Sequence, residues 1–251
     1  MDNINIDKSL ESIILNYIDK AKKLFEENKI DNAFKMFDKA LSLNYNYAES
    51  YLAKGEAHIQ MYDVEEAEKC IKKFLKISSE PLRGYLDMIE IYHMSGELDK
   101  ALDFCNKALK IKDNDYYVHY RKACILQEAN KLLEALDSFN KSINLNPNFY
   151  EAYCEKGELL KTLCDHEEAL NTFSKAIEID PTKSEAYTSK ALVYMDLMNY
   201  EKAYSLAKKA FDINPKDEWT KCYYFIIKDI LKRNTNIDKG LVIPFKLNKL
   251  S

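Results

Sequence analysis

Apolar residues recur along the chain with the spacing of amphipathic helices, in pairs of segments separated by two-residue breaks. Residues three and four apart lie on one face of an α-helix, so each apolar segment predicts a helix with one buried face. The breaks come 34 residues apart, and each contains a polar residue or a glycine. They are Asn28-Lys29, Tyr62-Asp63, Gly96-Glu97, Asn130-Lys131, Cys164-Asp165 and Met198-Asn199. The pattern predicts helix, turn, helix, repeated along the chain.

Three similar stretches fix the period of this repetition. S-E-A-Y-T-S-K-A begins at Ser184 and Y-E-A-Y-C-E-K-G begins 34 residues earlier, at Tyr150. A-E-S-Y-L-A-K-G begins at Ala48, three such periods before Tyr150. Carried along the chain without insertion, the period gives six units: 14–47, 48–81, 82–115, 116–149, 150–183 and 184–217. A fixed period of this length indicates a solenoid of stacked hairpins.

Aligned columns of the six units combine small and aromatic residues. The twentieth column is alanine throughout: Ala33, Ala67, Ala101, Ala135, Ala169 and Ala203. The eighth is small in five units of six: Ala21, Gly55, Ile89, Ala123, Gly157 and Ala191. The fourth is aromatic: Tyr17, Tyr51, Tyr85, His119, Tyr153 and Tyr187. Small residues at fixed contacts with aromatics between them specify closely packed helix pairs.

These columns, together with Pro147, Pro181 and Pro215 in column thirty-two, resemble the tetratricopeptide repeat family over residues 14–217. The resemblance implies an all-α, right-handed superhelical solenoid of six helix-turn-helix units. It also implies a concave wall lined by the first helix of each unit, which serves to bind other proteins. One departure is lysine in column seven, where the family often has leucine. We expect these lysines to lay their aliphatic stems over the hairpin and keep their amines in water.

Composition and charge exclude several other classes of protein. The net charge is −4 without a basic block, which argues against nucleic-acid binding. The sequence M-D-N-I-N-I-D-K-S lacks the features of a secretion signal, and the longest apolar run, 222–227, is far too short to cross a membrane. We therefore expect a cytoplasmic protein that does not bind membranes. Six cysteines without a Cys-x-x-Cys spacing predict free, mostly buried thiols.

No group of residues predicts catalysis, a metal site or a cofactor. His166-Glu167-Glu168 follows Asp165 at the start of a predicted helix, where acidic residues complement the helix dipole. Asp113-Asn114-Asp115 lacks the glycine and glutamate of a calcium loop. His58 falls on a core column. Cys124 and Cys154 fall on groove columns, where a small residue is a simpler interpretation than a redox role. We predict a protein that is not an enzyme and needs no cofactor.

The predicted concave wall, formed by columns 2, 5, 9, 12 and 13 of the six units, is acidic. It holds nine acids: Glu26, Glu49, Glu56, Glu90, Glu128, Glu151, Glu158, Glu185 and Asp196. Three bases, Lys22, Arg83 and Lys161, leave the wall at −6 and the remaining chain at +2. Its other candidate residues are Ile18, Phe25, Leu52, Ile59, Leu86, His93, Tyr117 and Tyr120. The alternative is that this charge bias arises by chance and the apolar residues pack on neighbouring helices.

The wall predicts an adaptor that binds a cationic, partly apolar segment of a partner protein. Some members of the family grip the C-terminal carboxylate of heat-shock chaperones with lysine, asparagine and arginine. The corresponding positions here are Ile18, Lys22, Ala53, Arg83 and Asp87, so a chaperone-tail clamp is not expected. The alternative function is a structural scaffold that self-associates through its ends or its C-terminal tail.

Both ends of the chain depart from the repeat. Residues 1–13 lead into the first helix, and residues 218–233 predict a capping helix whose apolar residues cover about 200° of its circumference. The tail, 234–251, contains L-V-I-P-F-K-L, in which Leu241, Ile243, Phe245 and Lys246 are candidate contact residues. Pro244 excludes a regular helix there. We expect the tail to dock on the capping helix or in an acidic groove, its own or that of a second copy. Disorder is the alternative.

Overall fold

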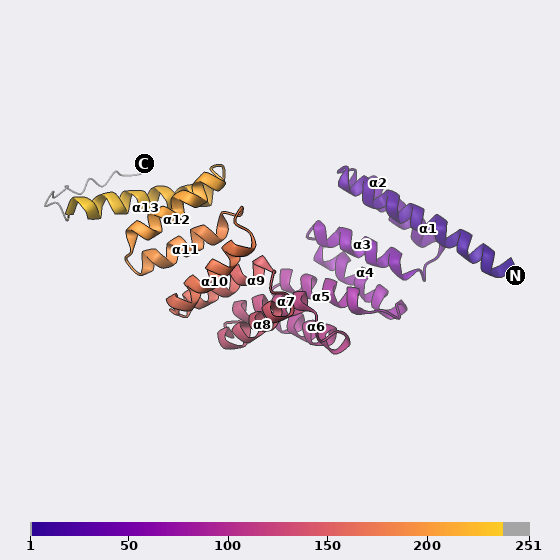
Figure 1. Cartoon of the computed structure of the whole chain (residues 1–251). Coiled ribbons are helices and arrows are strands. Elements are labelled where there is room, and N and C mark those ends of the chain that lie inside the picture. Colours follow the sequence, from indigo (N-terminus) through magenta and orange to yellow (C-terminus); the bar gives the residue numbers. More distant parts are fainter. Residues whose placement is uncertain (1, 238–251) are drawn as a thin grey trace. The chain divides into compact units, whose positions relative to one another are not determined.

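The computed structural model describes residues 2–237, which form thirteen α-helices and no strands (Figure 1). The first helices of the repeats are α1 (Asp2–Glu26), α3 (Ala48–Gln60), α5 (Leu82–Met94), α7 (Tyr116–Glu128), α9 (Tyr150–Thr162) and α11 (Glu185–Asp196). The second helices are α2 (Ile30–Leu43), α4 (Val64–Ile77), α6 (Leu98–Ile111), α8 (Leu132–Leu145), α10 (His166–Ile179) and α12 (Tyr200–Ile213). A last helix, α13, spans Glu218–Ile237. The predicted all-α fold is confirmed.

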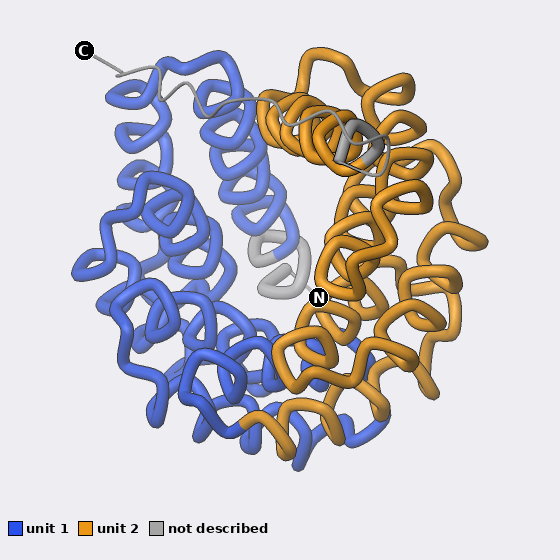
Figure 2. The backbone as a smooth tube through the Cα atoms, turned by 90° about the vertical axis from the view of Figure 1, so that its left-hand side faces the viewer, with its two compact units in different colours: residues 1–131 blue, residues 132–251 orange. Residues whose placement is uncertain are grey.

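The chain divides into two compact units, residues 1–131 and 132–251 (Figure 2). The division falls between α7 and α8, within the fourth repeat. In the first unit α1, α3 and α5 each pack with their second helix, and α7 packs on α5 and α6. In the second unit α9 and α11 pack with theirs, and α13 packs on α11 and α12. Helix α1 begins at Asp2, so the residues expected to lead into the first helix are themselves helical.

The small columns lie where the helices approach most closely. All six alanines of column twenty are completely buried. At Gly157 an added Cβ would stand 2.5 Å from Cε1 of Phe173, and at Gly55 it would stand 2.5 Å from Cδ1 of Ile71. Real Cβ atoms essentially never show so short a contact, so the glycines permit these helix spacings.

Every described hairpin turns through one residue with a left-handed backbone conformation. The six residues, all with φ between 55° and 71°, are Asn28, Tyr62, Gly96, Asn130, Cys164 and Met198. After each of them a backbone N–H donates to the carbonyl five residues earlier, at 2.8–3.0 Å, which closes the first helix. Only one of the six is glycine, the residue that adopts this conformation without steric cost.

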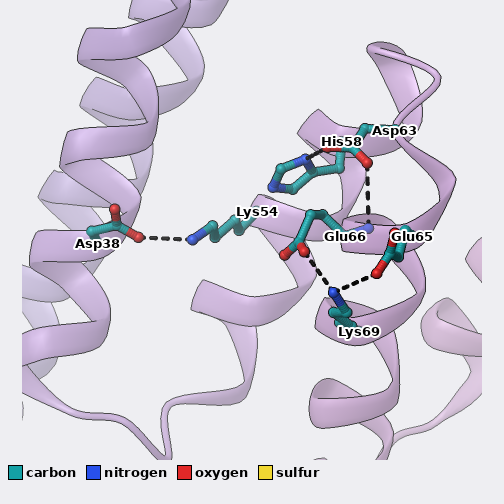
Figure 3. Close-up of polar contacts among 7 residues, drawn as sticks. All are labelled: Asp38, Lys54, His58, Asp63, Glu65, Glu66 and Lys69. Carbon is teal, nitrogen blue, oxygen red and sulfur yellow. Dashed lines mark hydrogen bonds and ion pairs between the residues drawn. The ribbon is translucent and has the colours of Figure 1, made fainter.

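The lysines of column seven tie neighbouring repeats together. The Lys54 Nζ donates to Asp38 Oδ1 of the preceding repeat at 2.8 Å (Figure 3). Lys122 reaches Asn106 in the same way at 2.8 Å, and Lys190 reaches the Ser174 hydroxyl at 2.6 Å. Each partner lies 16 residues earlier, on the outer layer of second helices. The expectation that these amines point into water was therefore wrong for these three repeats.

The second helix of a hairpin often begins with a side-chain cap. The Asp63 carboxylate accepts from the Glu66 backbone N–H at 3.4 Å and lies 3.0 Å from His58 Nδ1 (Figure 3). Asp165 and Asn199 cap α10 and α12 in the same position. These contacts satisfy N–H groups that a helix start leaves open, which is the role predicted for Asp165.

Candidate protein-binding surface

The first helices lie side by side within each unit and form its inner layer. In the first unit α1 contacts α3, α3 contacts α5, and α5 contacts α7. In the second unit α9 contacts α11, and α11 contacts α13. Among residues 2–131, by contrast, α2, α4 and α6 make no contact with one another. Because one layer is continuous and the other is spread apart, each unit presents its first helices on the narrower side of the stack.

Two candidate residues lie inside the core and not on this layer. Ile18 is 4% exposed and Leu52 is 1% exposed, because column five points between adjacent first helices. They cannot contact a partner, so their assignment to the groove was wrong. Phe25, Ile59, Leu86 and Tyr120 are half-buried, whereas Tyr117 is 42% exposed.

A cleft of about 230 Å³ opens between α1 and α3. Its lining residues come from α1, α2 and α3 and are Lys22, Phe25, Glu26, Phe37, Ala53, Glu56, Ala57 and Gln60. Buried Phe37, Ala53 and Ala57 form an apolar floor, and charged side chains form the rim. Such a floor accepts one apolar side chain, while the rim selects what lies beside it.

The cleft exists because the second repeat has alanine where other repeats have larger residues. Column ten is Ala57 here, and in the four later repeats it is Ile91, Ile125, Leu159 and Val193. Column six is Ala53 here and Asp87 in the next repeat. Removing that much side chain from a packed surface leaves room that the neighbouring helix cannot fill. The sequence contained this signal, but the concave-wall columns did not include either position.

Ion pairs link α1, α3 and α5 across the cleft and beyond it. Arg83 on α5 reaches Glu56 Oε1 at 2.8 Å and Glu49 Oε2 at 3.3 Å. Lys22 on α1 lies 3.9 Å from Glu56 Oε2 on the other side. Glu56 thus stands between two cations contributed by its neighbours. The pairs are partly exposed, so they hold geometry more than they add stability.

A second group of contacts links α5 and α7. Arg121 forms an ion pair with Glu90, and its Nη2 lies 3.1 Å from His93 Nδ1. His93 Nε2 in turn lies 2.7 Å from Glu128 Oε1. Arg121 occupies column six, so the sequence prediction missed it. Its guanidinium brings the charge of the first unit's inner layer closer to neutral than predicted, because five predicted acids now face three bases and leave it two charges negative.

Asp87 sits between these two groups and lacks a partner for one oxygen. Its Oδ2 is buried and has no hydrogen bond. Burial, reinforced by the nearby charge of Glu56 and opposed by Arg83, raises the pKa of the Asp87 carboxyl to about 7. The first unit therefore contains a carboxyl that changes charge near neutral pH, with Glu90 adding to the effect.

The second unit carries the remaining predicted acids. Glu151 is paired with Lys183 at 2.9 Å, Glu158 is paired with Lys161 at 2.5 Å, and Glu185 is exposed. Burial raises the pKa of the Cys154 thiol to about 12, which suppresses the reactive thiolate. Nothing in this geometry favours a redox role for Cys154.

Two searches of the described residues complete the survey of chemistry. Within residues 2–237, no group of three or more histidine, cysteine, aspartate or glutamate side chains is placed to hold a metal ion. No described helix combines the length and the apolar character needed to span a membrane.

Comparisons with known proteins identify the repeats. Family models described as tetratricopeptide repeats match residues 48–81, 116–149, 150–183 and 172–204. No curated protein matches the sequence. Among solved structures, YrrB, described as a TPR protein with an unusual peptide-binding site, is 26% identical and covers 73% of this chain and 95% of its own, with a TM-score of 0.57.

Two further structures share the fold at lower identity. PilF of Pseudomonas aeruginosa is 14% identical and covers 88% of this chain and 99% of its own, with a TM-score of 0.71. Yeast Tom70 is 20% identical and covers 91% of this chain and 49% of its own, also with a TM-score of 0.71.

Proposed function

Because the chain belongs to the tetratricopeptide repeat family, we propose that its first unit binds a polypeptide segment of another protein along α1, α3, α5 and α7. The observation that carries this proposal is the cleft between α1 and α3, with its apolar floor and charged rim. YrrB, a structural relative, is described as having a peptide-binding site, which supports the same class of activity. The proposed role is that of an adaptor, without catalysis.

The segment that fits is partly apolar and cationic. One aliphatic or aromatic side chain would enter the cleft above Ala53 and Ala57, beside Phe25. A lysine or arginine next to it would meet Glu26 on the rim, where the layer keeps its negative charge. Further along, Tyr117 and Tyr120 lie with ring centroids 6.1 Å apart and offer aromatic contact area. Complementary charge would steer the segment and fix its direction.

Designed peptides can test this proposal without knowledge of the natural partner. One set places a leucine or phenylalanine beside two lysines, a second replaces the lysines with glutamates, and a third replaces the apolar residue with serine. Fluorescence anisotropy with the full chain should detect binding of the first set alone. Ala57→Ile should abolish it, because isoleucine is already accommodated in column ten of two other repeats and would fill the cleft.

The matched control is Lys35→Ile, which adds the same side chain to the exposed face of α2. Circular dichroism would establish that both variants keep their helix content. Equal binding of the three peptide sets, or equal affinity for wild type and Ala57→Ile, would contradict the proposed site.

A further inference from the structure

Helix α13 occupies the place of the first helix of a seventh repeat. It packs on α11 and α12, as α11 packs on α9 and α10. Its buried residues are Thr220, Tyr224 and Ile227. The Tyr224 ring stacks on Phe211 at 4.8 Å, so the side of α13 that faces the sixth repeat is complete.

The opposite side of α13 exposes large apolar residues. Trp219 is 64% exposed, Phe225 is 50% exposed and Ile226 is 46% exposed, and Cys222 lies exposed among them. Residues 219, 222 and 226 are three and four positions apart, so they share one face. An apolar face of this kind at the end of a repeat stack normally requires a cover.

Phe225 makes a second helix an unsuitable cover. It falls in column eight, which is alanine or glycine in five repeats because the second helix of the hairpin approaches closely there. The exception, Ile89, belongs to a repeat whose column twenty-four is the small Cys105. A helix at the spacing seen around Gly157 would collide with a phenylalanine in this position. An extended chain is narrower than a helix and can pass beside the ring.

We propose that the segment Leu241–Leu247 covers this face of α13 in extended form, antiparallel to the helix. Residues 238–251 lie outside the described residues, and we use only their sequence. Extended alternation places Leu241, Ile243 and Phe245 on one side and Lys246 on the other. The apolar side faces Phe225 and Ile226, and the lysine faces water.

The length of the intervening chain permits this arrangement. Eleven residues separate Ile226 from the end of α13 at Ile237, which is roughly 16 Å at about 1.5 Å per residue. The seven residues of the segment span roughly 23 Å at about 3.3 Å per residue. Asp238–Gly240 supply the reversal, and Gly240 adopts tight turns readily. Leu247 then lies level with Cys222.

Labelling of Cys222 tests the cover directly. In the full chain carrying Leu241→Ser, Ile243→Ser and Phe245→Ser, the rate at which a maleimide modifies Cys222 should rise several-fold over wild type. The matched control, Val242→Ser with Lys246→Ser, changes the other side of the same segment and should leave the rate unchanged. Peptide mass spectrometry separates Cys222 from Cys164, which is also exposed.

A disulfide provides a second, positional test. Leu247→Cys should form an intramolecular disulfide with Cys222 under mild oxidation, and should fail to do so when combined with Cys222→Ser. Equal labelling rates in both serine variants, together with no disulfide, would overturn the proposal. So would a disulfide that joins two chains, or a dimer in light scattering that dissociates in the Leu241/Ile243/Phe245 variant. The last two outcomes would assign the face to a second copy of the chain.

Discussion

Asp87 offers a quantitative test of the electrostatics of the first unit. In the native chain its pKa is about 7, against an ordinary value of 3.8, because the carboxyl is buried near Glu56 and Glu90. Below the lower value, native and unfolded chains both hold the proton and Asp87 contributes no pH dependence. Between the two values the unfolded chain releases the proton while the native chain retains it, so stability falls as pH rises. Above the higher value the loss is complete and constant.

The magnitude follows from the separation of the two pKa values. A shift of about 3 units at about 1.4 kcal/mol per unit sets an upper bound of about 4 kcal/mol on the cost of ionised Asp87. Roughly 3 kcal/mol of this accumulates between about pH 5 and about pH 8. Asp87→Asn keeps the size of the side chain and removes the charge. Arg83 stays paired with Glu49 and Glu56 in this variant, so no buried cation is left alone.

The assay is urea denaturation followed by circular dichroism at about pH 5 and about pH 8, for wild type and Asp87→Asn. The variant should gain stability relative to wild type, and the gain should be larger at the higher pH. Asp103→Asn, on the exposed surface of α6, is the matched control and should show no such trend. If the stability difference between wild type and Asp87→Asn were the same at both pH values, Asp87 would be ionised throughout and its assigned environment would be wrong.

Three further perturbations test the packing, the turns and the binding surface. Ala169→Leu should destabilise by about 1–3 kcal/mol in thermal melts because it overpacks the completely buried column twenty, whereas the exposed Lys141→Leu should change little. Met198→Gly should stabilise by about 0.5–1 kcal/mol by relieving a left-handed backbone, while alanine at the same position should give no gain; a gain with both would refute this cause. Glu26→Lys should weaken binding of the leucine–lysine peptides and flatten its dependence on salt, and Glu134→Lys on α8 should not; affinities indifferent to salt and to both changes would remove charge from the recognition.

Sequence predicted the features that recur in every repeat. Column twenty predicted six buried alanines, and the breaks predicted the six turns, because a period of 34 residues repeats the same local physics six times. The left-handed conformation at Tyr62 and Met198 was not predicted, since bulky residues rarely adopt it and only Gly96 carried the usual signal. Tertiary packing of the hairpin sets the turn there despite the residue.

The pairing of charges was less predictable, because it depends on which side chains meet across neighbouring helices. Counting acids by column overstated the charge of the inner layer, since Arg121 lies one column outside the set yet reaches Glu90 and His93. Column five was assigned to the wall, but the angle between adjacent first helices turns Ile18 inward. A rotation of less than one helical position separates a core residue from a contact residue, and periodicity alone does not resolve it.

Differences between repeats distinguish candidate binding residues from residues that hold the fold. Columns eight, twenty and twenty-seven vary little because each hairpin must bring two helices to the same distance. Column six passes through Ala53, Asp87 and Arg121 in three successive repeats of the first unit, although the backbone environment hardly changes. Packing therefore does not dictate these residues. In succession they supply a cleft, a titrating carboxyl and a cation on one face, so substitutions in column six should alter binding with a smaller cost in stability than those in column twenty.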